Sequence, residues 1–172
     1  MNGGESAFWQ FSLRFYGRPG VPELCLALQD EHGVDINLLF LLIFLAKQGR
    51  RLSVGDVRAI DRETAAWRTN VVQPLRALRR QLKNGFPPMD AAATEALRGE
   101  IKRCELRAEK VQQEMMEQRF AADAVGAPCG MREAAASNIA AYGVVIAAPG
   151  DRLPQASVQA LLKIFSDEYS GP

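Results

Sequence analysis

The sequence contains little of what a metalloprotein or a disulfide-stabilised protein needs. It has one histidine, His32, so a metal site with two or more histidine ligands is excluded. Its three cysteines, Cys25, Cys104 and Cys129, are an odd number without a CxxC pair, which is typical of a reducing compartment rather than of a disulfide framework. We therefore expect no metal and no cofactor.

Long apolar runs and a strong net charge are also missing. The most apolar stretch, 38–46, has nine residues, whereas a helix that spans a bilayer needs about 20. The first six residues lack the basic region of a secretory signal, so we expect a cytoplasmic protein with no membrane partner. The formal net charge of +1 excludes an argument for nucleic-acid binding from total charge alone.

The apolar residues follow helical spacing, and no stretch shows the sustained period-2 alternation of a strand. We predict an all-α, single-domain bundle of about seven helices over residues 1–172. Its N-terminal half, 6–84, carries most of the sequence motifs, and a long helix near 91–125 and C-terminal helices make up 90–168. The apolar run 38–46 is expected to lie in a helix that is buried on all sides.

Small polar residues and glycines predict several helix boundaries. Gly33 is suited to the left-handed end of one helix, and Asp35 can cap the next one. Ser53 and Asp56 have the spacing of a capping box, which predicts a short helix from Val54 to about Ile60 with a new start at Asp61. Asp90 can cap the long helix that follows it. Pro74 predicts a kink near residue 70.

Two predicted helices have apolar residues on more than the single face that packing against one neighbour needs, or in a long regular pattern. In the first helix, Phe8, Phe11 and Phe15 share one side, while Trp9, Leu13 and Tyr16 form a neighbouring side. Core packing is the simplest interpretation, and an exposed docking stripe is the alternative. In the long helix, a weak heptad seam from Leu97 to Val125 predicts packing or self-association.

One candidate binding site is the connection around the single histidine. It groups Asp30, His32, Asp35 and Asn37 just before the most apolar helix. Carboxylates and imidazole can act as acids, bases or ligands, so a small-molecule or catalytic site is one interpretation. Helix capping by Asp35 and Asn37 is the structural alternative.

A second element of this candidate site is the segment before Pro74, which contains Trp67, Arg68 and Asn70. Backbone carbonyls released at a proline kink, beside an aromatic wall and a guanidinium, would suit a small anionic ligand. A buried tryptophan whose N–H bonds to a backbone acceptor explains the same residues without a ligand.

Positive charge is concentrated between residues 47 and 83, where ten basic residues accompany three acidic ones. Arg76, Arg79, Arg80 and Lys83 recur at helical spacing and line one helix face. That face could meet an acidic protein surface or a phosphate backbone. Alternatively, the glutamates of the long helix could neutralise it within the molecule.

Several phrases resemble a family of small proteobacterial proteins known as a domain of unknown function. They are Phe8-Trp9-x-Phe11-Ser12, Tyr16, Pro19-Gly20-Val21, Leu28-Gln29-Asp30-x-x-Gly33-x-Asp35-x-Asn37-Leu38-Leu39, Trp67, and Pro74-Leu75-Arg76-x-Leu78-Arg79. The resemblance covers about 8–83, implies a bacterial cytoplasmic helical protein, and supplies no catalytic residues. We therefore expect a non-enzymatic interaction or regulatory module that binds a protein or itself. A small-molecule site and RNA or DNA binding through 47–83 are the alternatives.

Overall fold

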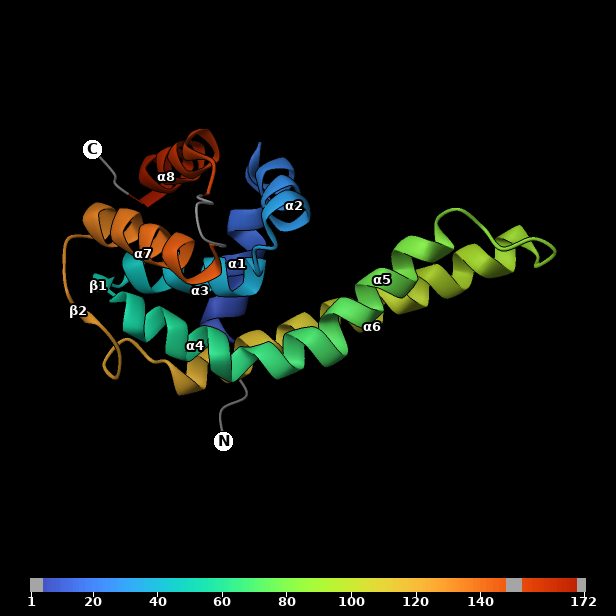
Figure 1. Ribbon diagram of the computed structural model, residues 1–172, viewed down its shortest axis with the longest axis horizontal. Helices are drawn as coiled ribbons and strands as arrows, with labels where there is room; N and C mark the ends of the chain where they lie inside the picture. The colour runs from blue at the N-terminus through green and yellow to red at the C-terminus, as the bar shows by residue number, and fades with distance from the viewer. Residues whose placement is uncertain (1–4, 148–152, 170–172) are drawn as a thin grey trace.

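The computed structural model describes residues 5–147 and 153–169, and its regular structure is almost entirely helical (Figure 1). Counting the continuous run from α4 through η1 to α5 as one helix, the described part contains seven helices, so the predicted all-α fold is confirmed. The elements are α1 (Ala7–Tyr16), α2 (Val21–His32), α3 (Ile36–Lys47), α4 (Val54–Trp67), the π-helical turn η1 (Arg68–Val72), α5 (Gln73–Leu82), α6 (Ala91–Arg119), α7 (Met131–Ile146) and α8 (Gln155–Tyr169), with two short strands, β1 (Arg50–Arg51) and β2 (Ala127–Pro128).

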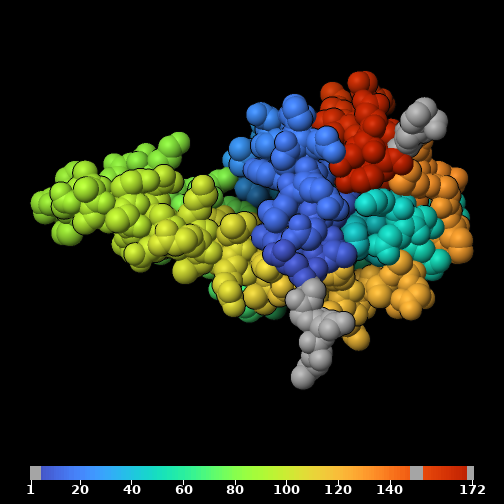
Figure 2. Space-filling view, turned by 180° about the vertical axis from the view of Figure 1, so that it is seen from behind, coloured from blue at the N-terminus to red at the C-terminus, as the bar shows by residue number. Residues whose placement is uncertain are grey.

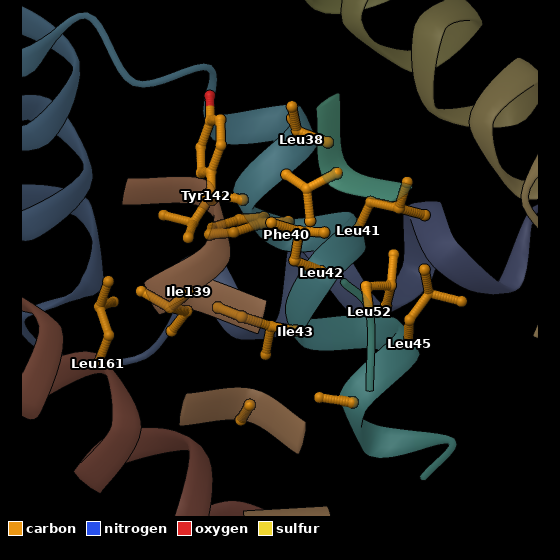
Figure 3. Packing of buried hydrophobic residues seen from close by; sticks show 14 of the residues in the cluster. Leu38, Phe40, Leu41, Leu42, Ile43, Leu45, Leu52, Ile139, Tyr142 and Leu161 are labelled. Carbon is orange, nitrogen blue, oxygen red and sulfur yellow. The ribbon is translucent and has the colours of Figure 1, made fainter. Parts of the chain in front are cut away.

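Helix α3 lies at the centre of the body, between α1, α6 and α7. Nine of its twelve residues are buried, as the apolar run predicts. Figure 3 shows its leucine and phenylalanine side chains leaving the helix in different directions, with Ile139 and Tyr142 of α7 packed beside them. Burial of this much apolar surface is the main stabilising contribution to a small domain.

The predicted caps are confirmed at four helix boundaries. Gly33 ends α2 with a φ of 65°, a conformation that glycine adopts without steric cost. The Asp35 carboxylate accepts hydrogen bonds from the first backbone N–H groups of α3. Ser53 and Asp56 form both hydrogen bonds of the capping box, and Asp90 caps α6.

Two predicted boundaries are wrong. Helix α4 does not end near Ile60, because Asp61 does not act as a cap and instead accepts a hydrogen bond from Arg68. The long helix ends at Arg119 rather than near 125, since Phe120 leaves the helical conformation and is buried in the core. At Pro74 the chain stays helical, and the expected irregularity is the π-helical turn η1.

A short connection that the sequence did not predict holds α6, α7 and α3 together. Strands β1 and β2 pair antiparallel, with Arg50 opposite Pro128. Gly126 is required here, because a Cβ atom at this position would lie 2.6 Å from the backbone oxygen of Arg51. The buried Asn138 side chain of α7 accepts a hydrogen bond from Leu52 N and donates to the backbone oxygens of Leu42 and Arg50.

Helix α5 and the first half of α6 form a helical hairpin that projects from the body (Figure 1). We call residues 73–104 the arm. The two helices of the arm share a thin seam of buried residues, Leu82, Thr94 and Ile101. Within the described residues, no helix is both long and apolar enough to cross a membrane.

Candidate functional site

Two residues of the predicted corner, Asp35 and Asn37, lie in a buried polar network. The Asp35 carboxylate accepts hydrogen bonds from Arg68 Nη1 at 3.1 Å and from Gln112 Nε2 at 3.0 Å. Asn37 Nδ2 donates to Gln112 Oε1 at 3.1 Å, and Gln113 Nε2 donates to Asn37 Oδ1 at 2.7 Å. Sequence reasoning missed both glutamines, because each one stands in a polar stretch of α6 with no local sign of burial.

The same network extends to η1 and to α7. Arg68 Nη1 also lies 2.8 Å from Asp61 Oδ1, and the Asp35 backbone N–H donates to the Tyr142 hydroxyl at 2.9 Å. Figure 3 shows this hydroxyl pointing toward the segment before α3. Burial alone would lower the pKa of Arg68, but the Asp35 and Asp61 carboxylates outweigh it and raise the pKa, so the guanidinium stays charged.

The other predicted corner residues lie elsewhere and do not converge. Asp30 pairs with Arg80 at 2.7 Å, and both side chains are about half exposed. The hydrogen bond from Arg80 holds the pKa of Asp30 below its ordinary value. His32 lies 3.9 Å from the carboxylate of its neighbour Glu31. Asn70 Nδ2 donates to Ala66 O one turn earlier in its own helix.

Trp67, the last residue of α4, connects the start of η1 to α6. Its indole Nε1 donates to the backbone oxygen of Ala108 at 3.0 Å. This is the hydrogen bond that the structural interpretation of Trp67 requires, but the side chain is 36% exposed rather than buried. The side chains of Trp67, Arg68, Asp35 and Asn37 therefore each form hydrogen bonds within the chain.

The basic face of α5 packs along glutamates of α6. Arg76 Nε lies 2.9 Å from Glu105 Oε1, and its Nη2 lies 2.6 Å from Glu109 Oε1. Arg79 pairs with the same Glu105 carboxylate. Burial alone would raise the pKa of Glu105, but Arg79 and Arg76 outweigh it and hold the pKa below its ordinary value. The pKa of Glu109 is raised, because burial exceeds the effect of its one partner, Arg76.

Most of the basic residues between 47 and 83 contact groups within the chain. The Arg50 guanidinium, for example, donates to the backbone oxygens of Val125 and Gly126. Lys47 lies over the rings of Phe11 and Tyr169, and Arg51 pairs with Glu133. With Arg68, Arg76, Arg79 and Arg80, seven of the ten basic side chains have internal contacts. The other three are Arg58, Arg62 and Lys83.

A cleft of about 390 Å³ opens where the arm joins the body, a feature that sequence reasoning missed. Helices α1, α2 and α3 line one side and α5 and α6 the other, and Figure 2 shows α1 and α2 beside α6. Its wall combines aromatic rings such as Trp9 with the paired charges Arg76 and Glu105. The second apolar side of α1, which contains Trp9, Leu13 and Tyr16, is the one sequence signal that pointed here.

Exposed apolar side chains are concentrated in two neighbouring areas of the surface. Of the eleven large apolar residues exposed in the described part of the chain, eight lie in these areas. Leu13, Tyr16, Leu26 and Leu106 line the cleft. Four others, between 43% and 65% exposed, belong to the arm: Leu78, Phe86, Met89 and Leu97.

The described residues contain no group of three or more His, Cys, Asp and Glu side chains placed to hold a metal ion. Searches of the curated proteins and of the solved structures gave no match to this chain. In a scan against family models, residues 7–116 match the model of DUF2390, which is described as a protein of unknown function. This range contains the arm and every residue that lines the cleft, but not α7 or α8. The chain therefore belongs to the DUF2390 family.

Proposed function

We propose that this protein is an interaction module that binds another protein through the arm. The observation that carries the proposal is the group of apolar side chains on the arm, Leu78, Phe86, Met89 and Leu97, which the rest of the described chain leaves exposed. Large apolar side chains left exposed on a projecting element are a feature of protein-binding sites. A projecting hairpin also presents this surface away from the body (Figure 1).

Charge indicates what kind of partner would fit. The arm contains seven basic and three acidic side chains. Arg76 and Arg79 are neutralised by Glu105 and Glu109, but Lys83, Lys102 and Arg103 have no carboxylate partner in the described part of the chain. The partner we propose is therefore a protein surface with an apolar centre and flanking carboxylates.

Two other expectations receive less support. Binding of RNA or DNA through 47–83 would need several unengaged cations, whereas seven of the ten have contacts within the chain. The Asp30–Asn37 corner has its polar groups engaged in capping and ion pairs. A bacterial, cytoplasmic setting and a regulatory role remain part of the proposal, and self-association through α6 is an outcome that the experiment below separates.

The experiment compares the wild-type chain with a triple arm variant, Phe86→Ser, Met89→Ser and Leu97→Ser. Proteins that co-purify from the organism of origin are identified, and the affinity of each for purified wild-type and variant chains is measured by calorimetry. We expect the variant to bind at least about tenfold more weakly, because three apolar contacts are lost. Val144→Ser, which removes an exposed apolar residue from α7, is the matched control and should bind normally.

Three results would contradict the proposal. The first is equal affinity of wild-type and arm variant for every co-purified protein. The second is native mass spectrometry that shows dimers of this chain that the arm variant abolishes, which would make the arm a self-association surface. The third is nucleic acid as the retained partner, with an affinity that falls steeply as salt rises. Unchanged circular dichroism of the variant shows that its fold is intact.

A further inference from the structure

The cleft at the base of the arm has the size and composition of a small-molecule site. Its volume of about 390 Å³ lies within the range of known ligand pockets. Apolar surface makes up most of its wall, as is typical of such sites, although nine of the seventeen residues that line it are polar or charged. The apolar members are Trp9, Leu13, Tyr16, Leu26, Ile36, Phe40 and Leu106.

A series of hydrogen bonds runs from Asp35 to Gln113 in the cleft wall, and the donor and acceptor of each bond are fixed. The Asp35 carboxylate can only accept, so Gln112 must turn its NH₂ group toward it. The Gln112 oxygen then accepts from the Asn37 amide, whose own oxygen accepts from Gln113 Nε2. At the end of this chain, Gln113 is left with its amide oxygen unused.

Two residues of the cleft wall each have a buried polar atom without a hydrogen-bond partner in the described part of the chain. The atoms are Gln113 Oε1 and Ser12 Oγ, from residues that are 3% and 4% exposed. Buried polar groups without a partner are costly, so native proteins rarely contain them unless something else satisfies them. Because Gln113 Oε1 can only accept, the group that satisfies it must be a hydrogen-bond donor.

The cleft wall contains five charged side chains, Arg76, Arg79, Lys102, Glu105 and Glu109, and the Glu109 carboxylate is the one with which a positively charged donor could pair. Glu105 has two arginine partners, whereas Glu109 shares Arg76 with it and has no second partner in the described residues. Glu109 and Gln113 are one turn apart on α6, so they lie on the same face. The rings of Trp9, Tyr16 and Phe40 add surfaces that attract cations.

We propose that the cleft binds a small amphipathic amine. Its ammonium group donates hydrogen bonds to Gln113 Oε1 and Ser12 Oγ and lies beside the Glu109 carboxylate. Its apolar body contacts the aromatic and leucine side chains of α1, α2 and α6. This site is separate from the exposed apolar residues of the arm, and the proposal does not depend on a protein partner.

The test uses three probes of matched shape, phenylbutylamine, phenylbutanol and phenylbutyrate, with the full chain. Binding is followed by nitrogen-15 NMR of the two tryptophan indoles, Trp9 and Trp67. Trp9 lines the cleft, and Trp67 is the internal reference because it does not. We expect the amine to shift the Trp9 signal and to bind at least about tenfold more tightly than the alcohol or the acid.

Variants then test the residues that recognise the ammonium group. Glu109→Gln keeps the shape of the side chain and should weaken amine binding about tenfold while leaving alcohol binding unchanged. Glu114→Gln, on the same helix and outside the cleft, is the control. If Glu109→Gln does not fold, Ser12→Ala replaces it, since that hydroxyl has no partner to lose; weaker amine binding is again the expected result.

Several results would overturn the inference. One is binding of the alcohol or the acid as tight as that of the amine, which would make the cleft a purely apolar or an anion site. Another is the absence of any Trp9 shift with the amine at millimolar concentration. A third is equal amine affinity for the wild-type chain and for whichever of Glu109→Gln and Ser12→Ala folds.

Discussion

At the scale of single residues, the most informative feature is the shared carboxylate Glu105. It is buried and holds two arginines of the other helix of the hairpin, Arg76 and Arg79. Removing one partner of such a group leaves the others unpaired in a partly desolvated place, which costs more than the pair itself contributes. Glu105 is therefore more important for the structure than its position in a charged helix suggests.

We predict that Glu105→Gln lowers the free energy of unfolding by about 1–3 kcal/mol near neutral pH, as measured by urea denaturation. The pKa of Glu105 is lowered in the folded state, so its contribution is present above the unfolded pKa of about 4.5 and is lost as pH falls through the folded pKa. The difference between wild-type and variant should therefore shrink in acid. A difference that stays constant, or grows, at low pH would contradict this assignment.

Cysteine reactivity provides a second prediction at this scale. Burial raises the pKa of Cys25 to about 12, so this thiol forms little of the reactive thiolate at neutral pH. Cys104 is exposed on the arm. With iodoacetamide under native conditions, mass spectrometry should show rapid modification of Cys104 and protection of Cys25. In urea the two rates should become similar, and fast modification of Cys25 in the native protein would show that its site opens readily.

At the scale of helices and strands, Asp35 connects the cap of the central helix to an ion pair. Its carboxylate bonds to the first turn of α3, to Arg68 and to Gln112. Asp35→Ala removes all three contacts, and we predict a loss of about 2–4 kcal/mol in the free energy of unfolding. Ser53→Ala, which removes a more exposed cap, should cost about 1 kcal/mol. Equal losses in the two urea titrations would show that Asp35 acts as a cap alone.

The helix caps could be predicted from the sequence because capping is a local interaction. Asp35, Ser53 and Asp90 each bond to backbone groups within three residues, so the necessary partners are adjacent in the chain. The end of α6 could not be predicted in this way. Residues 120–125 have good helical composition, and the chain turns there because Phe120 enters the core and Arg50 binds the carbonyl of Val125.

The seam of the long helix was predicted correctly only in part, because Ile101 and Ala108 of the seam are buried and other positions are not. Leu97, Cys104 and Val111, which follow the heptad spacing, are exposed. The buried positions include Glu105, Gln112 and Gln113, which hydropathy alone assigns to the solvent. Their burial depends on arginines and amides from other helices, so neither the network nor the cleft beside it could be found from the periodicity of α6.

At the scale of the whole molecule, the body and the arm are built differently. The body surrounds α3, which has nine buried residues, whereas the distal arm is held together by the seam of Leu82, Thr94 and Ile101 and by ion pairs. A thin seam buries less apolar surface per residue, so it contributes less stability. The two surfaces we propose for binding thus lie on the less stable part of the fold and at its junction with the body.

This difference predicts a gradient of hydrogen exchange along the chain. Amides of α3 should exchange most slowly, with a free energy close to that of global unfolding, because they open only when the core is lost. Amides of α5 and of the first two turns of α6 should exchange faster, through local opening of the arm. Mass-spectrometric exchange measurements on the intact chain test this gradient. Small amounts of urea should accelerate the amide exchange of α3 far more than that of the arm. Equal protection of both regions would mean that arm and body unfold as one cooperative unit, and a partner bound to the arm would then stabilise the whole molecule rather than the hairpin alone.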